Sequence, residues 1–193
     1  MGSDVAVDAC GERAAVEREF ESLSSTGEFA DDLLTALATR ARAAGACDLE
    51  IKILHSLMLN TANPYGEFCW CLALADAHRR HGAHGEAFRG TLMFALTFGV
   101  SIGCFEELVD IAAELREWST ETETSRRRVA RKVFVGLVLG VNGRFVDAVQ
   151  VFSEALSLPE SALFPHAGLR GLIEASEAGD SETLRRYQRD GEV

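Results

Sequence analysis

The chain has 193 residues, of which 47% are apolar and 25% are charged, and it contains only three prolines. This composition is typical of a globular protein with a buried core and disfavours a disordered or low-complexity chain. The formal net charge of −11 disfavours a general nucleic-acid binder, whose affinity would come from Lys and Arg side chains matched to phosphates. We expect a single all-helical domain over residues 1–193, with residues 1–10 flexible.

The N-terminal stretch MGSDVAVDACGERAAVEREF contains no basic segment followed by an apolar run, so we expect no secretory signal. Apolar runs elsewhere are too short or too interrupted to cross a bilayer, so we expect no membrane span. Five cysteines are odd in number, irregularly spaced and embedded in apolar stretches, which favours reduced core thiols over a disulfide framework. These are Cys10, Cys47, Cys69, Cys71 and Cys104. The sequence therefore predicts a cytoplasmic protein.

Apolar residues recur at helical spacing along most of the chain, and strand-like alternation is nearly absent. Ten helices are predicted, near residues 11–23, 28–44, 47–61, 65–81, 84–98, 101–118, 123–142, 144–157, 161–177 and 180–190. Gly45 and Gly82 stand where a helix C-terminus favours a left-handed residue. Asn63 ends one helix, and Pro64 opens the next. Because the connections are short, neighbouring helices should be antiparallel, which predicts an all-α fold of helical hairpins.

The clearest pattern lies in residues 139–159, LGVNGRFVDAVQVFSEALSLP, where apolar residues form a stripe at helical spacing. Gly136 lies in the preceding helix, Gly143 lies at the turn, and Phe152 follows Ala148 by four positions. Small residues let two antiparallel helices approach closely, and aromatic side chains fill the space between them. We therefore place Phe152 in the seam of a helical hairpin.

With these residues, the chain resembles the tetratricopeptide repeat over residues 129–159. It departs from that repeat at Lys132, where a large aromatic residue is usual. A second stretch, residues 70–98 (WCLALADAHRRHGAHGEAFRGTLMFALTF), is similar but has His84 and Thr91 where aromatic residues are usual. The resemblance implies antiparallel hairpins stacked as an α-solenoid.

The turn glycines of the two stretches, Gly82 and Gly143, are 61 residues apart, which is not a multiple of the repeat's period of about 34 residues. The predicted α-solenoid is therefore short and irregular. Irregular hairpins of this kind also resemble the helical solenoids of SNAP-type adaptors and of PCI-type complex subunits, to which the tail HAGLRGLIEASEAGDSETLRRYQRDGEV is similar. An unrelated helical bundle with a chance hairpin motif remains the alternative.

A metal site is one interpretation of His78, His81 and His84, which recur at three-residue spacing downstream of Cys69 and Cys71. His78 and His81 would share a helix face. A glycine should end the helix before His84, however, and the two cysteines would diverge on a helix. We favour surface and turn histidines and predict no metal and no other cofactor.

No enzyme signature is present: the chain contains no glycine-rich phosphate loop, no H-E-x-x-H and no G-x-S-x-G. The adjacent acidic pairs at 31–32 and 106–107 would point about 100° apart on a helix and would not converge. We therefore predict that the protein is not an enzyme.

A partner-binding site follows from the resemblance. In tetratricopeptide repeats the first helix of each hairpin lines a concave groove, which implies a site for another protein or peptide. The matching residues are Leu72, Asp76, Arg79 and Arg80 in the weaker stretch and Val133, Leu137 and Val141 in the stronger one. The alternative is that the last three are covered by the chain's own last helices, residues 161–190.

A second candidate partner site is the basic run SRRRVARK, with Arg126, Arg127, Arg128 and Arg131. These arginines would suit an acidic peptide, a phosphate or RNA. The other interpretation is a solvated helix face that pairs with neighbouring acidic residues.

The sequence thus predicts an adaptor, chaperone or complex subunit that binds a polypeptide in a helical-repeat groove. Two alternatives remain open. One is a structural subunit of a stable multiprotein assembly of the SNAP or PCI type, which should aggregate or self-associate without its partners. The other is a metal- or small-ligand-dependent helical enzyme, which elemental analysis would reveal if it held a metal. No oligomeric state is indicated.

Overall fold

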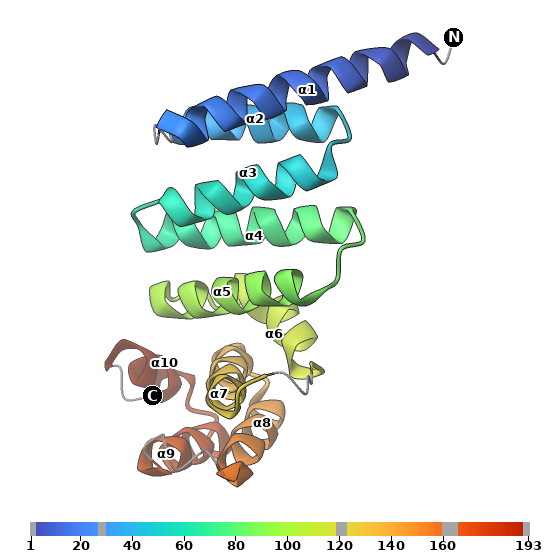
Figure 1. The fold of residues 1–193 in the computed structure, drawn as a ribbon. Helices are drawn as coiled ribbons and strands as arrows, with labels where there is room; N and C mark the ends of the chain where they lie inside the picture. The colour runs from blue at the N-terminus through green and yellow to red at the C-terminus, as the bar shows by residue number, and fades with distance from the viewer. Residues whose placement is uncertain (1–2, 27–29, 119–122, 160–165, 191–193) are drawn as a thin grey trace. The chain divides into compact units, whose positions relative to one another are not determined.

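The computed structural model describes residues 3–26, 30–118, 123–159 and 166–190 (Figure 1). Regular structure within these residues is entirely helical, which confirms the predicted all-α fold. The helices are α1 (Ser3–Thr26), α2 (Asp31–Ala43), α3 (Cys47–Asn60), α4 (Pro64–Arg80), α5 (Glu86–Ile102), the short 3₁₀ helix η1 (Glu106–Leu108), α6 (Val109–Arg116), α7 (Ser125–Val141), α8 (Phe145–Ser157), α9 (His166–Glu177) and α10 (Ser181–Asp190). No described helix is long and apolar enough to cross a membrane.

Several predicted boundaries differ from the structure, and two of these differences are large. The first helix begins at Ser3 and not at residue 11. The helix predicted over residues 101–118 is divided, because α5 continues to its last residue, Ile102, and Gly103 follows it. Gly103 has a φ of 82°, a left-handed conformation that terminates the helix, and η1 and α6 follow it. The flexibility expected for residues 1–10 falls partly outside the described residues and stays a prediction.

The turns that the sequence predicts are present. Gly45 and Gly82 have φ values of 67° and 65°, as expected for residues that follow a helix end. Asn63 caps α4, because its side-chain oxygen accepts a hydrogen bond from the Gly66 N–H at 2.7 Å. Pro64 is the first residue of that helix, where its missing N–H is not needed. Local turn chemistry therefore sets these helix ends.

The chain divides into two compact units, Met1–Thr91 and Leu92–Val193. In the first unit, α1 packs on α2, α2 on α3 and α3 on α4, each as an antiparallel neighbour (Figure 1). Its core is built from apolar residues at helical spacing, which include Leu34, Leu37, Ile53, Leu57, Phe68 and Leu74. The prediction of a single domain over residues 1–193 stays a prediction.

In the second unit, α7 and α8 form an antiparallel hairpin, with α9 packed on α8 and both α6 and α10 packed on α7. A Cβ atom added at Gly136 would lie 2.5 Å from the Phe152 ring, so glycine is what allows α8 to approach α7 here. Phe152 is fully buried, as predicted for the hairpin seam. Gly140, one turn later, makes the same kind of room for Leu184 of α10.

Candidate functional site

One face of α4 is exposed at both ends and half-buried at its middle. Its residues are Tyr65, Cys69, Leu72, Asp76 and Arg79, which we call the α4 face. At about 100° per residue they fall within a sector of about 80°. Tyr65 is 64% exposed, Cys69, Asp76 and Arg79 are exposed, and Leu72 is half-buried. The opposite face of the helix is buried in the core of the first unit.

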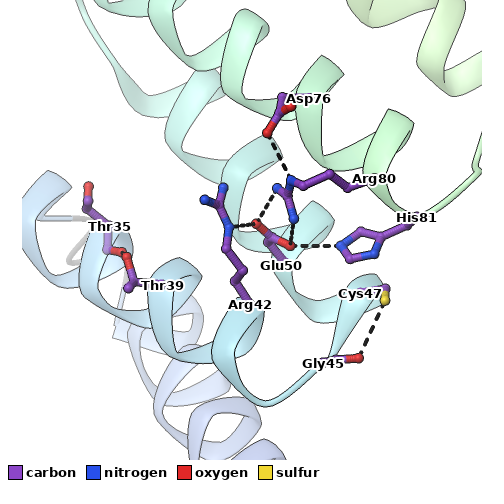
Figure 2. A network of polar contacts seen from close by, with 9 residues as sticks. All are labelled: Thr35, Thr39, Arg42, Gly45, Cys47, Glu50, Asp76, Arg80 and His81. Atoms are coloured by element: carbon purple, nitrogen blue, oxygen red, sulfur yellow. Dashed lines mark hydrogen bonds and ion pairs between the residues drawn. The ribbon is translucent and has the colours of Figure 1, made fainter.

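The C-terminal end of α4 is held by a buried carboxylate, Glu50 of α3 (Figure 2). Arg80 donates hydrogen bonds to both Glu50 oxygens, at 2.9 and 3.2 Å. Arg42 of α2 donates to one of them at 2.8 Å, and Nε2 of His81 lies 2.8 Å from the other. Asp76 on the α4 face accepts a hydrogen bond from Nε of Arg80 at 2.9 Å. We call Arg42, Glu50, Arg80 and His81 the Glu50 cluster.

The Glu50 cluster is electrostatically compensated. The Glu50 side chain is only 1% exposed. Burial by itself would raise its pKa, but the hydrogen bonds from Arg80, His81 and Arg42 lower the pKa to about 2. The carboxylate is therefore ionised at neutral pH with both oxygens occupied. Such a group does not suit a general base, and its geometry instead fixes α2, α3 and α4 against one another.

The three histidines considered as metal ligands have other roles. His78 is buried and packs on the Phe88 ring, with centroids 5.8 Å apart, and burial lowers its pKa. His84 meets the same ring edge-on at 5.4 Å, and His81 belongs to the Glu50 cluster. The part of the chain that the structure describes contains no group of three or more His, Cys, Asp or Glu side chains arranged to hold a metal.

The first four predicted groove residues lie on or beside the α4 face. Leu72, Asp76 and Arg79 belong to that face, and the Arg79 guanidinium lies 5.4 Å from the centroid of the Phe88 ring. Arg80 instead points to Glu50, so its main role is structural. The structure thus brings three predicted site residues together with Tyr65 and Cys69, which were not predicted to belong to the site.

The other three predicted groove residues are not at the surface. Val133, Leu137 and Val141 of α7 are 1%, 1% and 8% exposed. Helix α10 packs on α7, with Leu184 against Gly140. The prediction that these three residues form the apolar part of a binding groove is therefore corrected, because they belong to the core of the second unit. The alternative stated for these residues, cover by the chain's own last helices, agrees with this burial.

The basic run is only partly a surface feature. Arg126 and Arg127 are exposed, and Arg128 lies within 3.9 Å of the Glu123 carboxylate. Arg131 is 2% exposed, and it donates to both Glu123 oxygens and to the Leu115 carbonyl at 2.7 Å. Inclusion of Arg131 among the binding residues is therefore corrected, because its guanidinium ties α7 to the end of α6.

The cysteines differ in burial from the prediction. All five are free, but only Cys71 is buried, whereas Cys10 and Cys69 are exposed and Cys47 and Cys104 are intermediate. The prediction of core thiols was wrong for the exposed pair, because an apolar neighbourhood in the sequence does not say which face of the helix a residue occupies. Burial, with a smaller effect from the charge of Glu67, raises the pKa of Cys71 to about 12.

Glu50 is not among the site residues predicted from the sequence. A signal for it exists, because Glu50 occupies a helix position that shares the buried stripe of Leu49, Ile53, Leu54 and Leu57. A charged residue in the middle of an apolar stripe indicates either a buried ion pair or a position of the stripe that is open to solvent. Its partners Arg80 and His81 lie 30 and 31 residues away, so the sequence spacing does not reveal them.

Comparisons with protein-family models, with curated proteins and with solved structures find no match for this chain. The fold by itself defines the class of protein: an all-α protein of antiparallel helical hairpins packed in neighbouring pairs.

Proposed function

We propose that the protein is a non-enzymatic interaction module that binds another protein or peptide on the α4 face. The observation that carries this proposal is the exposure of Tyr65 at 64% in line with the half-buried Leu72. Aromatic side chains are strongly enriched among the residues that dominate binding energy at interfaces. Asp76 and Arg79 continue the line with charges of both signs, which suits the polar rim of an interface.

The Glu50 cluster supports this proposal because it makes the site rigid. Arg80 is clamped between Glu50 and Asp76, so the C-terminal half of α4 is fixed before any partner arrives. A pre-organised surface loses less conformational entropy on binding than a flexible one. A partner helix or extended segment with apolar side chains toward Tyr65 and charged side chains toward Asp76 would complement the site.

The biological role that fits is that of an adaptor, a chaperone or a complex subunit. Helical hairpins commonly present extended surfaces to polypeptides, and the close approach of α7 and α8 at Gly136 supports the tetratricopeptide resemblance of residues 129–159. Five free cysteines, two of them exposed, favour a reducing compartment such as the cytoplasm.

The proposal is tested by affinity capture from the native cell with quantitative mass spectrometry. Three baits are compared: the wild-type chain, Tyr65→Asp and the matched control Phe94→Asp, which alters another exposed aromatic residue, 52% exposed on α5. A direct partner should be enriched by the wild type and by Phe94→Asp and lost with Tyr65→Asp. If Tyr65→Asp remains folded by circular dichroism and retains every captured protein, the α4 face is not the binding site.

A further inference from the structure

The second unit has an open apolar pocket at the start of α8. It is lined by Phe145, Val146, Val149, Ser176 and Glu177, and its volume is about 300 Å³. Val146 is 86% exposed, more than any other large apolar residue that the structure describes. An exposed valine beside a half-buried phenylalanine is a surface that burial against a partner would stabilise.

Two glycine turns build this pocket. Gly143 has a φ of 78° and ends α7, so that Phe145 becomes the first residue of α8. Gly179 has a φ of 67° and follows the end of α9, and a Cβ atom added there would lie 3.6 Å from the Phe145 ring. The α9–α10 turn therefore lies against Phe145. The pocket is thus framed by fixed backbone at two helix ends.

The rim of the pocket is acidic. Glu177 is the last residue of α9 and is exposed, and Glu174 lies one turn earlier on an exposed position. Neither carboxylate has a basic partner among the residues that the structure describes. The C-terminal end of α9 adds partial negative charge. Arg144, the basic residue next to Phe145, is bound by Asp147 at 2.8 Å, so it does not neutralise the rim.

The hydroxyl proton of Ser176 in the pocket is already engaged. The Ser176 hydroxyl donates to the Leu172 carbonyl at 2.8 Å and is buried. The pocket therefore offers a ligand no free hydroxyl proton, and recognition rests on apolar contact and on the Glu177 carboxylate, which accepts hydrogen bonds from a cationic group. The chain's net charge of −11 disfavours a second copy as the occupant, because the acidic rim would face another acidic surface.

We propose that this pocket docks a peptide segment of another protein that carries a large apolar side chain next to a lysine or arginine. The apolar side chain lies against Phe145, Val146 and Val149, and the basic side chain pairs with Glu177. This site is separate from the α4 face, on the other compact unit, and selects a partner of different chemistry.

The experiment begins with the selection of a phage-displayed library of random peptides on the full chain. The enriched consensus should join Leu, Met or Phe to Lys or Arg. A fluorescein-labelled synthetic peptide of that consensus is then titrated by fluorescence anisotropy against the wild type, Val146→Asp and Glu177→Lys. Matched controls are Phe94→Asp for the apolar change and Glu107→Lys for the charge reversal, since both residues are exposed elsewhere in the same unit.

Val146→Asp should weaken binding of this peptide by at least ~10-fold, because it puts a charge against the apolar side chain. Glu177→Lys should weaken peptide binding by ~3- to 10-fold. It should also make the affinity less dependent on salt concentration, because the attraction that salt screens, between Glu177 and the basic side chain of the peptide, is lost. The two control variants should bind like the wild type.

Three outcomes would overturn the inference. The selected peptides lack the apolar–basic pair, or both pocket variants bind the peptide unchanged. Alternatively, sedimentation reveals a dimer that Val146→Asp dissociates, which makes a second copy the occupant. If Tyr65→Asp abolishes peptide binding and Val146→Asp does not, the peptide binds the α4 face. This result would contradict the inference about the pocket but not the proposed function.

Discussion

The α2–α4 region and the α7–α8 hairpin are both built from antiparallel helices, but different forces hold them. In the α2–α4 region a buried carboxylate, Glu50 of α3, binds Arg42 of α2 together with Arg80 and His81 at the end of α4. In the hairpin, glycine at position 136 admits the Phe152 ring in an apolar seam, and Lys132 of α7 pairs with Glu154 of α8 at 2.6 Å beside it. Burial of the Glu50 carboxylate costs free energy that all of its basic partners are needed to offset. The apolar seam requires only that the Phe152 ring fit the space left by Gly136.

The largest effect is expected in the apolar seam. Phe152→Ala should lower the free energy of unfolding by about 3–5 kcal/mol, because it leaves a cavity where a fully buried ring stood. Urea denaturation measures the change. Val146→Ala, at an 86% exposed position of the same helix, serves as the control and should stay within about 0.5 kcal/mol of the wild type. Equal effects of the two substitutions would show that the seam does not hold the second unit.

The stability that the Glu50 cluster contributes should depend on pH. Because the pKa of Glu50 is lowered from 4.5 to about 2 in the folded chain, its stabilisation is present above pH 4.5 and is lost as the pH falls through about 2. Glu50→Gln should therefore cost about 2–3 kcal/mol at neutral pH and progressively less below pH 4.5.

The control for this prediction is Glu107→Gln, at an exposed position, which should leave the unfolding free energy unchanged at each pH. Urea unfolding of both variants and the wild type at about pH 6 and about pH 3 gives the comparison. If Glu50→Gln lowers the free energy of unfolding by the same amount at both pH values, the charge of the carboxylate does not stabilise the first unit.

Two Gly→Ala substitutions should change the stability in opposite directions, because one glycine lies in a closely packed seam and the other on an open helix surface. Gly136→Ala should destabilise by about 1–2 kcal/mol, because the new Cβ would lie 2.5 Å from the Phe152 ring. Gly90→Ala in α5 should stabilise by about 0.5–1 kcal/mol, since no atom of the described residues lies within 4 Å of the added Cβ and alanine favours the helix. Thermal melts report both, and a stabilised Gly136→Ala would disprove the close approach.

Chemical labelling of cysteines perturbs the protein least, and it distinguishes the exposed face of α4 from the buried one. Cys69 and Cys10 are exposed and should react with a thiol reagent in the native chain. Cys71 is buried, its pKa is raised to about 12, and it should react only after denaturation. Peptide mapping after brief labelling tells them apart. Native-state labelling of Cys71 at the rate of Cys69 would mean that α4 is rotated from the orientation described.

The difference between the two regions also explains what the sequence could predict. The seam was predictable because glycine and aromatic residues at fixed offsets leave a local signature, and Gly136 and Phe152 are only sixteen positions apart. Helix ends at Gly45, Gly82 and Pro64 were predictable for the same reason, since their causes are local.

The Glu50 cluster and the fate of the groove residues depend on tertiary packing instead. Glu50 looks like an ordinary charged helix residue until α4 brings Arg80 to it. Val133 and Leu137 fit a groove floor in the repeat pattern, but the pattern does not encode whether a later helix covers them. The α4 face was predicted in part, because Leu72, Asp76 and Arg79 came from the repeat positions, whereas the exposure of Tyr65 follows only from the fold.

The most direct test of the proposed binding surface is isothermal titration of the captured partner against Asp76→Arg, Arg79→Glu and Arg127→Glu. We predict that the first two, on the α4 face, each weaken binding by about tenfold or more, while Arg127→Glu, an exposed residue of the basic run, binds like the wild type. Circular dichroism confirms that each variant is folded. Unchanged affinity for both α4 variants together with weakened binding by Arg127→Glu would contradict the account and place the partner on the basic run.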